Sequence, residues 1–294
     1  MLRKLIPALL AAGLLSGAAG AAQAADKIAL VVSTLNNPFF VTLENGAKAK
    51  AKELGYDLIV LDSQDNPAKE LANVEDVLNQ NIKALLLNPA DSDAAKASAR
   101  AAVAKNVPVI SLDRAVNGVA VTSHIASDNV GGGKMAGDLI AEKLGGKGDV
   151  VELQGIPGAS AARDRNKGFL EAMAAAPGLK VVASQTANFD RAQGLTVMEN
   201  ILQAHPSIDA VFAANDEMAL GAIKAIQAAK RNIVVVGFDG TDDGVAAIKS
   251  GTMFASVAQQ PALIGSLGVE AADKVIKGQT VPASTPVPLT MIKQ

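Results

Sequence analysis

The chain has 294 residues, with 27 Lys and Arg against 29 Asp and Glu, and it contains no cysteine. This length is enough for two domains of ordinary size, and the lack of cysteine excludes a disulfide framework and any thiolate metal site. A net charge of −2 without basic clusters excludes the electrostatic surface that nucleic-acid binding requires.

The first 24 residues have the pattern of a secretory signal peptide. Arg3 and Lys4 are followed by an almost wholly apolar or small run that ends in Ala22-Gln23-Ala24. A membrane anchor is the alternative, but Leu5–Leu15 is too short for a hydrocarbon core of about 30 Å. We therefore expect residues 1–24 to be removed and the mature protein to be periplasmic.

After residue 25, short apolar runs rich in Val and Ile alternate with stretches typical of helices. Continuous apolar runs such as 233–236 are typical of strands that are buried on both faces of a parallel sheet. The alternation predicts βαβ units of an α/β fold, and ten strands are too many for one small sheet. We expect strands at Lys27–Ser33, Asp57–Asp62, Ala84–Asn88, Val107–Asp113, His124–Ser127, Asp149–Gln154, Lys180–Gln185, Ala210–Asn215, Ile233–Phe238 and Phe254–Ala258. Helices are expected between them, for example at Pro38–Leu54, Pro67–Gln80, Asp91–Lys105 and Asp190–Ala204.

Many of the predicted strands end in a polar side chain. Ligands of open α/β sheets bind beyond the carboxyl ends of the strands, so these side chains converge if two sheets face each other. Turns and helix caps explain any single one equally well, but they explain six or more together less well. The positions are Asn36-Asn37, Asn88, Asp113-Arg114, Asn215-Asp216, Asp239 and Gln259-Gln260.

Residues suited to catalysis or metal binding form no recognised motif. The only histidines, His124 and His205, lie far apart, and no His-Glu-x-x-His spacing is present. Gly158-Ala159-Ser160 resembles a nucleophile elbow, but Ala162 breaks the pattern and no histidine follows an acid in the required order. We therefore expect no catalytic residue and no metal, and we assign neither His124 nor Ser160 a ligand role.

A glycine cluster raises the alternative of a dinucleotide cofactor. Gly131, Gly133 and Gly137 follow a predicted strand and open a helix, which is the correct context for that motif. The spacing is Gly-x-Gly-x-x-x-Gly, however, and the next strand ends in Gln154 without an acidic residue. Close packing of backbone explains the glycines equally well, so we expect no cofactor.

The remaining polar and aromatic residues suit a sugar. Sugar hydroxyls both donate and accept, so carboxylates, guanidinium groups and amides can satisfy them, while phenylalanine rings cover the apolar C–H faces. Core packing is the alternative for each phenylalanine. The candidate ligand-binding residues are Asn37, Phe39, Phe40, Asn88, Asp113, Arg114, Arg165, Phe189, Asn215, Asp239 and Gln259.

Long segments around these residues can be compared with known families. They read IALVVSTLNNPFF at 28–40, LDSQDNPAKELANV at 61–74, SHIASDNV at 123–130, NDEMALGA at 215–222 and VVGFDGT at 235–241. From about Lys27 to Gln294 the chain resembles the pentose- and hexose-binding group of the type I periplasmic binding proteins. All eleven candidate residues match the ligand positions of that group.

The resemblance implies two similar Rossmann-like lobes with parallel sheets, joined by a hinge of three segments. The lobes are expected at 25–127 with 260–288 and at 128–259 with 289–294. The resemblance also implies D-ribose enclosed in the cleft, an ATP-driven (ABC) permease of the inner membrane as partner, and a chemoreceptor as a second partner. A monomer is expected.

Three alternatives remain beside that interpretation. A transcription repressor core shares this fold, but it needs a helix-turn-helix where this chain has the signal-peptide pattern. A sugar-processing enzyme needs a paired acid and base, whereas ion pairs with arginine are expected to keep Asp113 and Asp239 charged. Within the binding class, the alternative ligand is a related furanose or hexose, or a furanosyl signal molecule.

Overall fold

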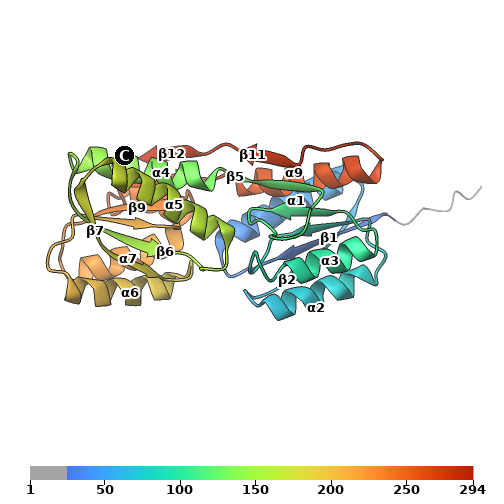
Figure 1. Cartoon of the computed structure of the whole chain (residues 1–294), viewed down its shortest axis with the longest axis horizontal. Helices are drawn as coiled ribbons and strands as arrows, with labels where there is room; N and C mark the ends of the chain where they lie inside the picture. Colours follow the sequence, from blue (N-terminus) through green and yellow to red (C-terminus); the bar gives the residue numbers. More distant parts are fainter. Residues whose placement is uncertain (1–24, 294) are drawn as a thin grey trace, which may run out of the picture.

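The computed structural model describes residues 25–293, so the predicted signal peptide at 1–24 lies outside the described residues. Two six-stranded sheets form separate α/β lobes that lie side by side along the longest axis of the molecule (Figure 1). In each lobe, helices cover both faces of the sheet (Figure 1). The predicted class of two α/β lobes with parallel sheets is confirmed.

The first lobe has the strand order β11-β5-β4-β3-β1-β2, and every neighbouring pair is parallel. Helices α1 and α9 pack on one face of this sheet, and α2 and α3 pack on the other. Its strands are β1 (Lys27–Val32), β2 (Asp57–Asp62), β3 (Ala84–Leu87), β4 (Val109–Leu112), β5 (Ser123–Ser127) and β11 (Ser284–Val287). Its helices are α1 (Pro38–Leu54), α2 (Pro67–Leu78), α3 (Lys96–Ala104) and α9 (Pro261–Ile276).

The second lobe repeats this arrangement with the order β12-β10-β9-β8-β6-β7. Only its edge strand β12 runs antiparallel to its neighbour β10. Its strands are β6 (Lys147–Gln154), β7 (Gly178–Thr186), β8 (Ala210–Ala213), β9 (Val234–Asp239), β10 (Ala255–Ala258) and β12 (Thr290–Lys293). Its helices are α4 (Asn129–Lys143), α5 (Ser160–Ala175), α6 (Arg191–Ala204), α7 (Asp216–Ala228) and α8 (Asp242–Lys249).

The ten strands expected from the sequence correspond to β1 to β10, whereas β11 and β12 were not predicted. Pro286 lies in β11 and lacks the N–H group that a central strand needs, which is tolerated because β11 is an edge strand. The helix expected from Asp91 begins at Lys96 instead. Residues 91–95 form turns, in which Asp91 Oδ1 accepts hydrogen bonds from the N–H groups of Asp93 and Ala94.

Close helix packing explains the glycine cluster that raised the dinucleotide alternative. A side chain at Gly133 of α4 would collide with the carbonyl of Arg165 in α5, and one at Gly168 of α5 would collide with the carbonyl of Val130. The glycines therefore let α4 and α5 approach closely. Between residues 25 and 293, no helix has the length and apolar character that crossing a membrane requires.

The chain passes from one sheet to the other at three points. The first passage lies between β5 and α4, the second between β10 and α9, and the third between β11 and β12. Each sheet therefore gains an edge strand from the last 34 residues of the chain, β11 in the first lobe and β12 in the second. This topology brings the ends of strands from both lobes to a common cleft.

Candidate functional site

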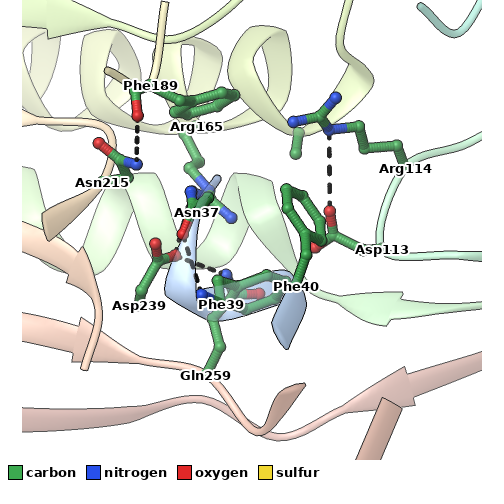
Figure 2. A pocket seen from close by; sticks show the side chains of 11 residues that line it. Asn37, Phe39, Phe40, Asp113, Arg114, Arg165, Phe189, Asn215, Asp239 and Gln259 are labelled. Carbon is green, nitrogen blue, oxygen red and sulfur yellow. Dashed lines mark hydrogen bonds and ion pairs between the residues drawn. The ribbon is translucent and has the colours of Figure 1, made fainter. Parts of the chain in front are cut away.

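Residues from both lobes line one cavity between the two sheets (Figure 2). The space between their side chains that protein atoms do not occupy is about 250 Å³, and part of it is open to solvent. Its lining residues are Asn37, Phe39, Phe40, Asp113, Arg114, Ala161, Arg165, Phe189, Asn215, Asp239 and Gln259.

Ten of the eleven candidate residues therefore lie together, and Asn88 is the exception. Its Oδ1 accepts hydrogen bonds from the N–H and hydroxyl groups of Ser33, and its Nδ2 donates to the carbonyl of Leu112. Nδ2 also lies 3.5 Å from Asp113 Oδ2. Asn88 is fully buried beneath the cavity, where it fixes the carboxylate of Asp113.

Asp113 and Asp239 occupy equivalent places in the two lobes. Asp113 follows β4, and Asp239 ends β9, which is the matching strand of the second sheet. Asp113 has a φ of 61° and Asp239 a φ of 114°. Such positive values are uncommon for residues other than glycine and cluster at functional sites, because the surrounding structure must hold them.

Each aspartate lies near an arginine. Arg165 Nη1 is 3.6 Å from Asp239 Oδ1, and Arg114 Nε is 3.9 Å from Asp113 Oδ2. All four side chains are at most 5% exposed. Burial raises the pKa of both carboxyl groups, while the arginines oppose that shift. The expectation that arginine keeps both aspartates charged is therefore wrong for Asp239, because burial outweighs the arginine and raises the pKa of that carboxyl group to about 8.

Arg165 is held by hydrogen bonds as well as by charge. Its Nε donates to Oδ1 of Asn129 over 2.9 Å, and its Nη1 donates to the carbonyl of Ala214 over 2.7 Å. The guanidinium carbon lies 3.7 Å from the ring centre of Phe238, which adds a cation–π contact. Asn129 was not predicted, because nothing at the start of α4 shows that it orients an arginine of α5.

Arg114 is fixed in a similar way from the first lobe. Its Nη1 donates to the carbonyl of Pro89 over 3.0 Å, and its guanidinium carbon lies 5.1 Å from the ring centre of Phe40. The same carbon lies 5.6 Å from the ring centre of Phe189, which belongs to the second lobe. The guanidinium group thus contacts aromatic rings of both lobes.

Local sequence sets the aromatic walls of the cavity. Asn37 caps α1 by accepting a hydrogen bond from the N–H of Phe39, and Pro38 occupies the first turn. The helix then turns Phe39 and Phe40 inward, with their rings edge to face at 5.1 Å. Phe189 approaches from the second lobe, and its ring fits because Gly155 has no side chain there.

Amide groups complete the polar lining. Asn215 caps α7 through its Oδ1, which accepts from the N–H of Met218, and its Nδ2 donates to the carbonyl of Phe189. Gln259 Nε2 donates to Asp239 Oδ1 over 2.8 Å. These contacts fix the amides before any ligand binds.

Two acceptor atoms of the lining residues lack a hydrogen bond. Within residues 25–293, Asp113 Oδ1 and Gln259 Oε1 are buried side-chain atoms without a partner, as is Ser127 Oγ. Buried polar groups are almost always paired, so these acceptors on lining residues leave places for donors from water or from a bound molecule. Hydroxyl groups are suitable donors, because each can also accept from an arginine or an amide.

The two histidines that were set aside are not among the lining residues. His124 Nδ1 and Ser111 Oγ are 2.8 Å apart, and His205 is the C-cap residue that follows α6 in the other lobe. Among the described residues, no group of three or more His, Cys, Asp or Glu side chains is arranged to hold a metal ion. Ala161 lines the cavity but was not predicted, because a small apolar residue on a helix carries no sequence signal.

Comparison with known proteins places the chain in a family. The profile described as "Periplasmic binding protein domain" matches residues 28–280. The ribose import binding protein of Haemophilus influenzae is 56% identical over 292 residues, which is 99% of this chain and 100% of that protein. The protein of the same name from Escherichia coli is 55% identical over 99% of this chain and 98% of its own length.

A solved structure shows the same fold. The periplasmic solute-binding protein of an ABC transporter from Actinobacillus succinogenes, with bound D-allose, is 33% identical with a TM-score of 0.87. The match covers 91% of this chain and 97% of that protein. The chain therefore belongs to the periplasmic binding proteins, and it is a periplasmic sugar-binding subunit of an ABC importer rather than an enzyme.

Proposed function

We propose that the chain binds D-ribose in the cavity between its lobes and delivers it to an ABC permease of the inner membrane. The observation that carries this proposal is a cavity lined from both lobes by two arginine–aspartate pairs and three phenylalanines. The names of the relatives at 55–56% identity support ribose as the sugar. A chemoreceptor is proposed as a second partner, and the protein acts as a monomer.

The eleven candidate residues have distinct roles in this proposal. Arg114 and Asp113 hold neighbouring hydroxyls from the first lobe, and Arg165 and Asp239 do so from the second. The unpaired acceptors Asp113 Oδ1 and Gln259 Oε1 receive hydrogen bonds from sugar hydroxyls. Asn37, Asn215 and the rings of Phe39, Phe40 and Phe189 complete the enclosure, while Asn88 supports Asp113 from below.

The proposed lobes are 25–127 with 260–288 and 128–259 with 289–294. A hinge of three segments, near 127–128, 259–260 and 289, lets them separate and close. These segments coincide with the three passages of the chain between the sheets. Sugar bound to both lobes favours the closed form, which the permease recognises.

Export is proposed to depend on residues 1–24 as a signal peptide, with cleavage after Ala24. N-terminal sequencing of the protein from the periplasm should begin at Ala25. Retention of residues 1–24 in the exported protein would contradict this part of the proposal.

A hexose is the second candidate ligand, because the solved relative described above contains D-allose. Calorimetry should decide between them with D-ribose, 2-deoxy-D-ribose, D-arabinose and D-allose as ligands. We expect D-ribose to bind most tightly, because the polar groups of the lining pair with its hydroxyls. A sugar that lacks one hydroxyl leaves the corresponding polar group without a hydrogen bond. Tighter binding of D-allose than of D-ribose would replace the proposed ligand.

A further inference from the structure

A second contact between the lobes lies at the start of α5, outside the cavity. The N–H of Ser92 in the first lobe donates to the carbonyl of Gly158 over 3.0 Å. In the opposite direction, the N–H of Ser160 donates to Oγ of Ser92 over 3.0 Å. The N–H of Ala115, also in the first lobe, donates to Oγ of Ser160 over 2.9 Å. Three hydrogen bonds thus join the lobes within a few residues.

One of these bonds caps a helix across the lobe boundary. The N-cap residue of α5 is Ala159, whose side chain makes no capping hydrogen bond. The first N–H groups of a helix need partners outside it, and Ser92 of the other lobe supplies one to Ser160. Ser92 is fully buried in this position. The same helix carries Arg165, so the contact fixes the helix that supplies a lining residue to the cavity.

Gly158 allows the two lobes to approach this closely. A Cβ atom at this residue would collide with the carboxylate of Asp91, and its three nearest atoms all belong to Asp91 of the other lobe. That carboxylate is held in place, because its Oδ1 accepts hydrogen bonds from the N–H groups of Asp93 and Ala94. A methyl group at residue 158 is therefore tolerated within its own lobe but obstructs the contact between lobes.

We propose that Ser92, Gly158 and Ser160 form a latch that holds the lobes together without touching the sugar. None of the three lines the cavity. The latch rests on one part of the proposed function, which is that the two lobes separate and close. Since its hydrogen bonds exist only in the closed arrangement, it slows the release of an enclosed sugar and leaves sugar capture unchanged. Ser160, which was assigned no ligand role from the sequence, would thus influence ribose affinity without contacting the sugar.

The first test measures ribose binding and its kinetics. Ser92→Ala, Ser160→Ala and Gly158→Ala should each weaken ribose affinity about tenfold, as expected for the loss of one or two hydrogen bonds. The change should lie in the dissociation rate, with the association rate and the sugar-free melting temperature unchanged. Ser207→Ala, at an exposed residue between α6 and β8, is the control. Parental dissociation rates in all three variants would overturn the latch.

The second test measures closure without sugar, so it separates the latch from the proposed ligand. The chain has no cysteine, so Glu75→Cys on α2 and Glu199→Cys on α6 allow one spin label on each lobe. We expect the two labels to lie close together in a fraction of the sugar-free parent molecules, and we expect Gly158→Ala to reduce that fraction. If the parent fails to bind ribose, the proposed function is wrong and these distances still decide the latch. Equal short-distance fractions in Gly158→Ala and the Ser207→Ala control would contradict it.

Discussion

Removal of the Arg165 side chain should weaken ribose binding more than any change to an aromatic wall. Arg165→Ala removes the bonds to Asn129 Oδ1 and to the carbonyl of Ala214, together with the ion pair to Asp239 at 3.6 Å. Asp239 is 5% exposed and would lose its nearest positive charge, and the sugar would lose the charge-assisted donor that Arg165 supplies. Truncation of one partner of a buried, hydrogen-bonded charge pair costs about 2–5 kcal/mol. The dissociation constant should therefore rise by about 30-fold to several thousandfold.

Isothermal calorimetry with D-ribose measures this change, and circular dichroism checks that the variant folds. Lys167→Ala is the matched control, because Lys167 lies on the same helix and is exposed to solvent. The control should bind ribose like the parent. Equal affinities of Arg165→Ala and Lys167→Ala would refute the assignment of Arg165 to the site.

Three further predictions follow from the same geometry. Phe39→Ala should reduce the free energy of ribose binding by about 1–3 kcal/mol, which is less than the loss from Asp113→Ala, because it removes apolar contact area and leaves no charged group without a partner. Calorimetry measures both values, and the opposite order would contradict the roles given to Phe39 and Asp113. In the closed arrangement, burial raises the pKa of Asp239 from 3.8 to about 8, so closure of the sugar-free parent should become less favourable relative to Asp239→Asn as the pH rises from about 4 to about 8. The distance between the spin labels on α2 and α6 at several pH values measures this change, and a closed fraction that varies equally with pH in both proteins would show that the pKa of Asp239 is not raised. Saturating ribose should raise the melting temperature and reduce the radius of gyration, whereas unchanged dimensions in X-ray scattering would count against closure.

The sequence predicts the central strands well because each is a continuous apolar run buried on both faces, as in Ile28–Val32. The same reasoning fails for β11 and β12. These edge strands are short and include Pro286, so their pairing depends on a sheet formed by distant residues. Edge strands of this kind have no local pattern that separates them from loops.

The site shows the same division between local and distant causes. Asp113 and Asp239 could be predicted because each follows directly from a strand and lies at its carboxyl end. Asn88 has the same position at a strand end, yet it lies beneath the cavity because its amide is occupied by Ser33 and Leu112. Direction and depth of a side chain depend on neighbouring strands, which the local sequence does not specify.

Residues that act across elements carry no local signal at all. Asn129 orients Arg165 only because α4 and α5 pack closely through their glycines. Ser92 caps α5 only when the two lobes meet. Both residues have ordinary roles in their own segments, and their contribution becomes visible only in the assembled structure.

The crystal structure of the ribose complex tests the central claim most directly. We predict one ribose molecule between the lobes, with its hydroxyls donating to Asp113 Oδ1 and Gln259 Oε1, the two lining acceptors that lack a partner. Arg114 and Arg165 should donate to the sugar from opposite lobes. A sugar bound elsewhere, or one that leaves both acceptors unpaired, would contradict the account.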